Sequence, residues 1–127
     1  MKKYKVMVID DEEDFLKIVK LNLETTDRYE VLTLSTAKDM IIEVHRFRPD
    51  VILLDLLMPS IGGIEACEML NNDSIGKGIP IIVLSALDKD QDRLKAYKVG
   101  AVGYLVKPVQ AEELIAKIEK VIQHKQL

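Results

Sequence analysis

The chain has 127 residues, of which 48% are hydrophobic and 31% charged, with a formal net charge of -3. This balance is typical of one globular domain, residues 1–127, and no basic run is dense enough to indicate a nucleic-acid-binding surface. The apolar runs are too short for a signal peptide or a membrane span, and the single cysteine, Cys67, excludes a disulfide framework or a cysteine-based zinc site. We therefore expect a cytoplasmic protein that contacts neither nucleic acid nor membrane directly.

The first strand and the first helix are predicted by a change in apolar spacing. Residues 5–9 form a strand that is apolar from Val6 onward and ends in two acids, and residues 12–25 carry apolar side chains at helical spacing. The expected buried stripe comprises Phe15, Leu16, Val19 and Leu23, widened by Ile18 and Leu21. Acidic residues 12–14 then lie in the first helical turn, where negative charge suits the helix dipole.

The next two strands differ in character. Residues 29–34 mix apolar and polar side chains, which favours an edge strand, whereas residues 51–54 are continuously apolar, which favours a strand buried on both faces. Between them we expect a helix capped by Thr36, because Asp39 three residues later resembles a capping box. Pro49 should end this helix.

The second half of the chain continues the alternation. The remaining elements are expected as a helix at 64–70, a strand at 79–84, a helix at 88–99, a strand at 103–106 and a helix at 111–124. Asp88 is predicted to cap the helix at 88–99, and Gly100 suits the position just after its end. The apolar stripe of this helix, mainly Leu94 and Tyr97, is the weakest in the chain.

Five strands that alternate with five helices predict an α/β fold with one doubly wound parallel sheet covered on both faces. The runs at 5–9, 51–54 and 79–84 are the most apolar, so we place them inside the sheet and the other two strands at its edges. This fits the flavodoxin-like strand order 2-1-3-4-5, whose switch point lies between the first and third strands.

Polar side chains follow four of the five predicted strands: Asp10 and Asp11, Asp55, Ser85, and Lys107. In an open parallel sheet, ligands bind outside the carboxyl ends of the strands. Two carboxylates about 4 Å apart repel by roughly 4 kcal/mol at an effective dielectric constant near 20, so three in one pocket require positive charge. Lys107 supplies one positive charge, and an all-oxygen site favours Mg²⁺ over zinc for the rest.

A carboxylate beside Mg²⁺, a lysine and a hydroxyl indicates phosphoryl transfer. Asp55 is the expected nucleophile and would form an aspartyl phosphate. Lys107 and the Ser85 hydroxyl would bind the other phosphoryl oxygens, where negative charge spreads in the transition state. Backbone N–H groups of the loop after Asp55 could add further donors.

From about residue 4 to residue 125, the chain resembles the receiver domain of two-component response regulators. The resemblance depends on Asp10-Asp11, segment 55–63 with Met58-Pro59 and Gly63, Ser85-Ala86, and Lys107-Pro108. It implies that Asp55 is the phosphoacceptor, and that Asp11, Asp55 and the Leu57 carbonyl bind Mg²⁺ while Asp10 assists. It also implies that Ala86 joins Ser85 and Lys107 in binding phosphate.

The resemblance also implies how the signal is received and transmitted. The donor would be a phosphohistidine on a sensor histidine kinase or a phosphotransfer protein. Ser85, where the family more often has threonine, and Tyr104 would form the conformational switch, and the Lys107–Pro108 peptide would be cis. We expect that the chain catalyses no separate turnover reaction. It would act on an output partner or domain that the sequence does not name. Dimerisation, if it occurs, would depend on phosphorylation.

Three other functions are open to the same fold. An aspartyl-phosphate phosphatase of the haloacid dehalogenase kind needs a D-x-D motif and a cap insertion, whereas Asp55 is followed by Leu56 and Leu57. A flavodoxin-like cofactor protein needs a hydroxyl- and glycine-rich phosphate loop, whereas residues 10–14 are all acidic. A degenerate receiver that acts only through protein contacts is disfavoured by the complete set of acids, hydroxyl and lysine.

Overall fold

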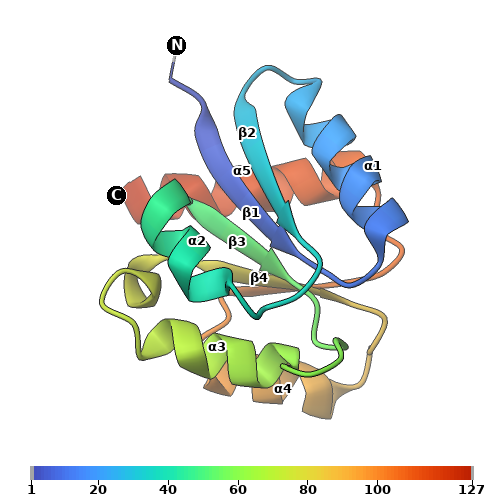
Figure 1. Ribbon diagram of the computed structural model, residues 1–127. Helices are drawn as coiled ribbons and strands as arrows, with labels where there is room; N and C mark the ends of the chain where they lie inside the picture. The colour runs from blue at the N-terminus through green and yellow to red at the C-terminus, as the bar shows by residue number, and fades with distance from the viewer. Residues whose placement is uncertain (1, 127) are drawn as a thin grey trace.

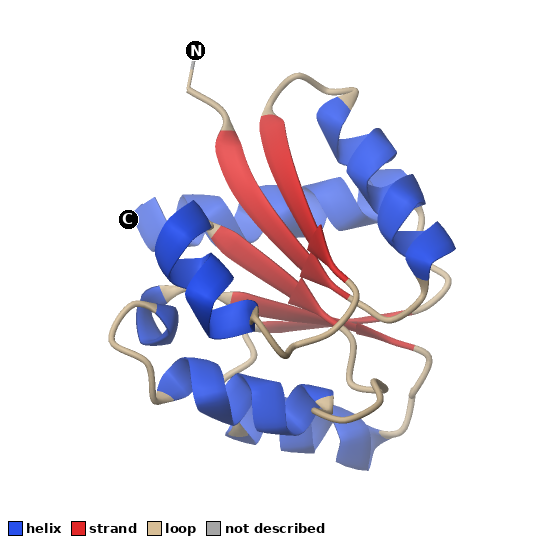
Figure 2. Ribbon diagram, in the orientation of Figure 1, coloured by secondary structure: helices blue, strands red, loops and turns tan. Residues whose placement is uncertain are grey.

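Five parallel strands form the centre of the structure, a computed structural model that describes residues 2–126 (Figures 1 and 2). The strands are β1 (Tyr4–Ile9), β2 (Tyr29–Leu34), β3 (Val51–Leu54), β4 (Ile81–Ser85) and β5 (Gly103–Val106). The helices are α1 (Glu13–Glu24), α2 (Met40–Phe47), α3 (Gly63–Asn71), α4 (Asp90–Lys98) and α5 (Ala111–Gln126), with a 3-10 turn η1 (Gly76–Gly78). The strand order is β2-β1-β3-β4-β5, as predicted.

The helices cover both faces of the sheet, as Figure 1 shows. Successive strand residues point to opposite faces, so each central strand contributes to both halves of the core. In β1, Val8 packs in the cluster formed with α1 and α5, whereas Ile9 packs in the cluster formed with α2 and α3. Helix α4 lies over the far end of the sheet, where Ala96 packs with Val83 and Tyr104. Among the described residues, no helix is both long and apolar enough to cross a membrane.

The register of the sheet brings the carboxyl ends of the strands together. Ile9 pairs with Leu34 on one side and with Leu54 on the other. The backbone N–H of Asp55 then donates to the carbonyl of Ile9 at 3.1 Å, and that of Lys107 donates to the carbonyl of Ser85 at 2.9 Å. The polar residues that follow the strands therefore start from adjacent points on one edge.

The prediction that Ile18 and Leu21 widen the buried face of α1 is wrong. Their side chains are exposed, whereas Leu16, Val19 and Leu23 are buried against the sheet. Residues spaced three and four apart already cover the strip of sheet beneath one helix, so a wider stripe has nothing to pack against.

The predicted caps of α2 and α4 are also wrong. Thr36 accepts a hydrogen bond from the N–H of Lys38 in a preceding turn, and α2 begins only at Met40. Lys89, not Asp88, is the N-cap of α4, and its backbone N–H donates to Asp92 at 3.3 Å. At Thr36 a local turn uses the hydroxyl that the sequence pattern assigned to the helix start, and α4 begins one residue later than the pattern predicts.

The predicted apolar face of α4 is likewise wrong. Ala96 is the buried residue of this helix, whereas Leu94 and Tyr97 are 56% and 47% exposed. A small side chain lets α4 lie close to the sheet, and the larger apolar side chains then point away from the contact. Gly100, with φ at 102°, follows the helix as predicted because glycine adopts this left-handed conformation without strain.

Candidate functional site

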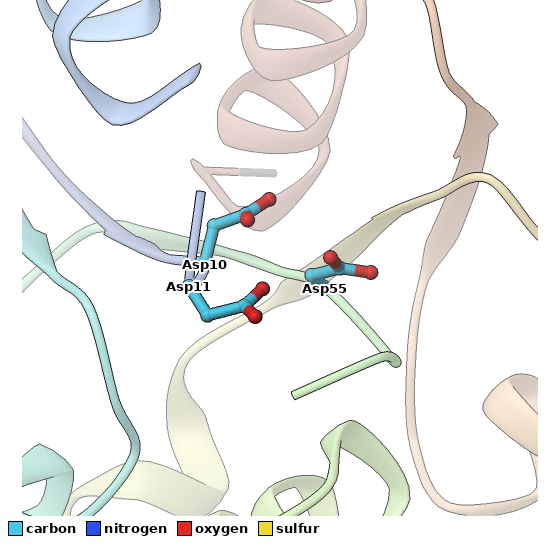
Figure 3. Close-up of side chains that lie close together, drawn as sticks. All are labelled: Asp10, Asp11 and Asp55. Carbon is cyan, nitrogen blue, oxygen red and sulfur yellow. The ribbon is translucent and has the colours of Figure 1, made fainter. Parts of the chain in front are cut away.

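Three carboxylates meet at the carboxyl edge of the sheet (Figure 3). Asp10 and Asp11 directly follow β1, and Asp55 directly follows the neighbouring β3. One oxygen from each carboxylate lies within 4.8 Å of the other two. Asp10 and Asp55 are buried, at 1% and 5% exposed, whereas Asp11 is exposed to solvent. The sequence-predicted acids therefore form one cluster with a single solvent-exposed member.

Lys107 supplies the positive charge of this cluster. Its Nζ donates to Asp10 Oδ2 at 2.6 Å, to Glu12 Oε1 at 2.9 Å and to Asp55 Oδ2 at 3.3 Å. Burial by itself lowers the pKa of Lys107, but the hydrogen bonds to Asp10 and Glu12 and the negative charges of Asp10 and Asp55 together outweigh burial and raise it. Lys107 is therefore a cation at neutral pH, with its charge shared among three carboxylates.

Two residues around Lys107 have roles beyond those that the sequence predicts. Glu12 is expected in the first turn of the helix, yet it precedes α1 and its carboxylate binds Lys107. Phe15 is expected in the apolar stripe, yet its ring centroid also lies 4.2 Å from Lys107 Nζ, within range of a cation–π contact. The sequence feature that could have indicated this role of Glu12 is the acidic run 10–14, which is longer than the start of a helix requires.

The two buried carboxylates are held by backbone donors as well as by Lys107. Asp10 accepts from the Glu12 N–H at 2.9 Å, and Asp55 accepts from the Leu57 N–H at 3.1 Å. Burial raises the pKa of Asp10 above its ordinary value, although its hydrogen bonds with Lys107 and Glu12 act in the opposite direction. Both side chains are thus fixed in orientation while their negative charge is only partly offset.

The loop after Asp55 folds back, so that its far end at Gly63 lies against the backbone of Asp55 and Leu56. The N–H of Gly63 donates to the carbonyl of Leu56 at 3.0 Å. A Cβ at Gly63 would stand 2.5 Å from both the carbonyl oxygen of Asp55 and the Cα of Leu56. Only glycine fits there, so this residue lets the loop close tightly and holds the 52%-exposed Leu57 beside the acids.

Ser85 and Tyr104 meet at one backbone position. Ser85 is fully buried, and its Oγ accepts from the Leu87 N–H at 3.3 Å. The Tyr104 hydroxyl donates to the Leu87 carbonyl at 2.7 Å. Tyr104 is 8% exposed, with the Arg93 guanidinium 5.3 Å from its ring centroid, and burial is the main cause that raises its pKa. The two residues expected to form the switch therefore both hydrogen-bond to the backbone of Leu87, Ser85 to its N–H and Tyr104 to its carbonyl.

The donor set of the acid cluster suits a hard divalent cation. Three carboxylates from neighbouring strands, without histidine or cysteine in the cluster, offer the oxygen ligands that Mg²⁺ prefers. Ala86 is exposed next to Ser85 at the same edge, and the Lys107–Pro108 peptide is cis, as the resemblance implied. The structure thus brings Asp10, Asp11, Asp55 and Lys107 together, and it places Ser85 and Ala86 at the carboxyl end of the neighbouring strand β4.

Residues 6–119 match the family described as the response regulator receiver domain. The chain belongs to this family. Receiver domains are signalling switches of two-component systems, and phosphorylation and Mg²⁺ binding are typical of them. The family membership and the fold expected from the sequence are both confirmed.

Relatives and solved structures agree with this assignment. The chain is 30% identical to the alkaline phosphatase synthesis transcriptional regulatory protein PhoP of Bacillus subtilis over 97% of this chain and 50% of PhoP. It is 36% identical to the probable transcriptional regulator ycf27 of Guillardia theta over 95% of this chain and 46% of that protein. The chemotaxis protein CheY4 of Vibrio cholerae superposes with a TM-score of 0.89 at 29% identity, covering 94% of this chain and 99% of CheY4. The chain thus spans about half the length of the curated relatives it matches.

Proposed function

We propose that Asp55 accepts a phosphoryl group from a phosphohistidine of a sensor histidine kinase or a phosphotransfer protein. The observation that carries this proposal is the buried Asp55 carboxylate, oriented by the Leu57 N–H and Lys107 beside two further carboxylates. In the transfer, the P–N bond to the donor imidazole breaks and its electron pair returns to that nitrogen. A bond forms between phosphorus and a carboxylate oxygen of Asp55, which is the nucleophile and needs no base to remove a proton.

Different residues around Asp55 would stabilise different parts of the charge on the phosphoryl group. Lys107, already 3.3 Å from Asp55 Oδ2, would follow the incoming negative charge and bind a phosphoryl oxygen. Ser85 and the backbone N–H of Ala86 would bind another. Mg²⁺, held by Asp11, Asp55 and the Leu57 carbonyl with help from Asp10, would neutralise charge on the transferred group. This removes the repulsion that three carboxylates would otherwise present to a phosphate.

The conformational response would pass through Leu87. When the Ser85 hydroxyl turns toward the phosphoryl group, it releases the Leu87 N–H, from which it accepts a hydrogen bond at 3.3 Å. The Tyr104 hydroxyl, which donates to the carbonyl of the same residue at 2.7 Å, then loses a fixed partner. The link from β4 to α4 and the ring of Tyr104 would thus change together and present an altered surface to an output partner or domain.

Intact-mass spectrometry with acetyl phosphate and Mg²⁺ tests this function. We expect the mass to increase by one phosphoryl group in the wild type and in Asp88→Asn, an exposed control. The Asp55→Asn variant should gain nothing, and an Asp55→Asn protein that is still modified would refute the assignment of the phosphoacceptor. Repeated turnover of p-nitrophenyl phosphate would instead favour a phosphatase and contradict the proposal that this chain catalyses no separate reaction.

A further inference from the structure

A pocket of about 430 Å³ lies at the end of the sheet opposite the acid cluster. Ile79 and Pro80, which precede β4, and Val102, which precedes β5, form one wall. Residues of α5 between 117 and 125, the turn η1, Asn71 at the end of α3 and Gly100 contribute the rest of the wall. Its volume lies within the range of small-molecule sites, about 300–1,000 Å³. The pocket shares no residue with the candidate phosphoacceptor site.

The charged groups that line this pocket are all basic. They are Lys77, Lys117, Lys120 and Lys125, with His124 beside them, and no carboxylate belongs to the lining. The chain as a whole has more acidic than basic residues, 21 against 18, so this local excess is not a reflection of composition. Within residues 2–126 none of the four lysines forms an ion pair, in contrast to Lys107. A pocket lined in this way carries a positive potential that attracts anions.

The other part of the lining is apolar. Ile79, Pro80, Val102 and Val121 contribute aliphatic surface, and Val102 is 50% exposed although it adjoins a buried strand. A simple inorganic anion would leave this surface in contact with water. A ligand with an apolar part would cover it, at a gain of about 25 cal/mol for each Å² removed from water.

Gly103 makes room for one of the lysines. A Cβ at Gly103 would stand 2.6 Å from the Cε and 3.4 Å from the Nζ of Lys117. The lysine side chain therefore lies directly against the backbone of β5, next to the pocket that it lines. Glycine weakens a strand interior and often marks a close approach by another group. Here the group that approaches is a cationic side chain.

We propose that this pocket binds a small organic phosphate of the nucleotide type. The phosphate group contacts the lysines, which bind phosphate as point charges, and the apolar part lies on Pro80 and Val102. Four ammonium groups suit a multiply charged anion better than a single carboxylate. The proposal does not depend on chemistry at Asp55, because the two sites lie at opposite ends of β4 and β5.

Backbone amide NMR of the labelled protein in EDTA tests this site with three probes: AMP, inorganic phosphate and adenosine. We expect AMP to give saturable shifts at residues 77–79, 100–103 and 117–125, and no shifts at Asp55 or Ser85. Adenosine, which lacks the charge, should not bind. Inorganic phosphate, whose charge is similar to that of AMP, should bind more weakly than AMP, and equal or tighter binding of inorganic phosphate would refute a role for the apolar wall.

Matched variants separate this pocket from general charge attraction. Lys117→Gln combined with Lys120→Gln should weaken AMP binding roughly tenfold for each charge-assisted hydrogen bond that the substitutions remove. Lys17→Gln combined with Lys20→Gln, an exposed pair at the same spacing on α1, should leave it unchanged. Equal weakening by both pairs, or saturable shifts nowhere at millimolar AMP, would overturn the proposal.

Gly103→Ala is a second test that changes no charge. The added methyl group displaces the Lys117 side chain, which can move because it is flexible, and AMP binding should fall. Thermal melts of each variant report whether the fold is retained. A folded Gly103→Ala protein with wild-type affinity would show that the position of Lys117 is irrelevant to binding.

Discussion

Replacing Lys107 by methionine should destabilise the protein in the absence of Mg²⁺. At an effective dielectric constant of about 20, the attraction of Nζ is about 6 kcal/mol to Asp10 at 2.6 Å and about 5 kcal/mol to Asp55 at 3.3 Å. Desolvation of Lys107, whose side chain is 12% exposed, offsets much of this attraction. Removing one partner of a buried ion pair costs about 3–5 kcal/mol, and we expect about 3 kcal/mol because Asp10 can take up a proton.

The destabilisation should depend on pH in a defined direction. Burial already raises the pKa of Asp10 above 3.8, and loss of Lys107 removes a group that lowers it. A group whose pKa is higher in the folded state contributes stability that is complete below the unfolded pKa and is lost as pH rises through the folded pKa. The free energy of unfolding of Lys107→Met should therefore lie closer to that of the wild type at pH 5 than at pH 7.5.

Urea unfolding followed by circular dichroism in EDTA measures both effects. The control Lys95→Met changes an exposed lysine on α4. Its free energy of unfolding should stay within about 0.5 kcal/mol of the wild-type value. Addition of Asp10→Asn to Lys107→Met should recover part of the stability, because it removes one unpaired carboxylate. A difference below about 1 kcal/mol, or one that does not vary with pH, would refute the reasoning.

Three further predictions follow from single features of the structure. Because Asp11 is exposed, Asp11→Asn should unfold like the wild type in EDTA but should lose most of the stabilisation by Mg²⁺, about 2.7 kcal/mol at a hundredfold excess over Kd. Thermal melts with and without Mg²⁺ measure this, and an undiminished response would contradict the proposed ligand. Gly63→Ala should cost about 1–3 kcal/mol because its Cβ would stand 2.5 Å from the Asp55 carbonyl, whereas Gly78→Ala, with nothing within 4 Å, should cost almost nothing in urea unfolding. Burial raises the pKa of the Cys67 thiol to about 11, so thiol reagents should label it at pH 8 only after unfolding, and rapid labelling of the folded protein would count against its burial.

The strands and the edge that carries the site were predictable from the sequence. Buried parallel strands are short continuous apolar runs, and β3 was predicted with its observed bounds. The strand order follows from which runs are most apolar, and this order places Asp10 and Asp55 side by side. The roles of Asp55, Ser85 and Lys107 in phosphoryl transfer remain predictions that the proposed experiments test.

Helix starts and exposed helix faces were less predictable. Thr36 has the residue type of an N-cap, but its hydroxyl is used in a local turn before α2, and the N-cap of α4 lies one residue after Asp88. Leu94 and Tyr97 have the hydrophobicity of core residues, but the close approach of Ala96 to the sheet turns them to solvent. Such choices depend on how near a helix lies to its neighbours, which spacing along the chain does not specify.

The sequence by itself determined the order of the elements and which polar residues share one edge, because apolar runs mark the buried strands and a polar residue follows most of these runs directly. Only the tertiary structure decided which groups touch. In it, the Glu12 carboxylate binds Lys107, and Ser85 and Tyr104 both hydrogen-bond to the backbone of Leu87. It also gathered the lysines of η1 and α5 around one pocket. These contacts link residues far apart in the chain, and their distances are set by packing and rotamers rather than by local pattern.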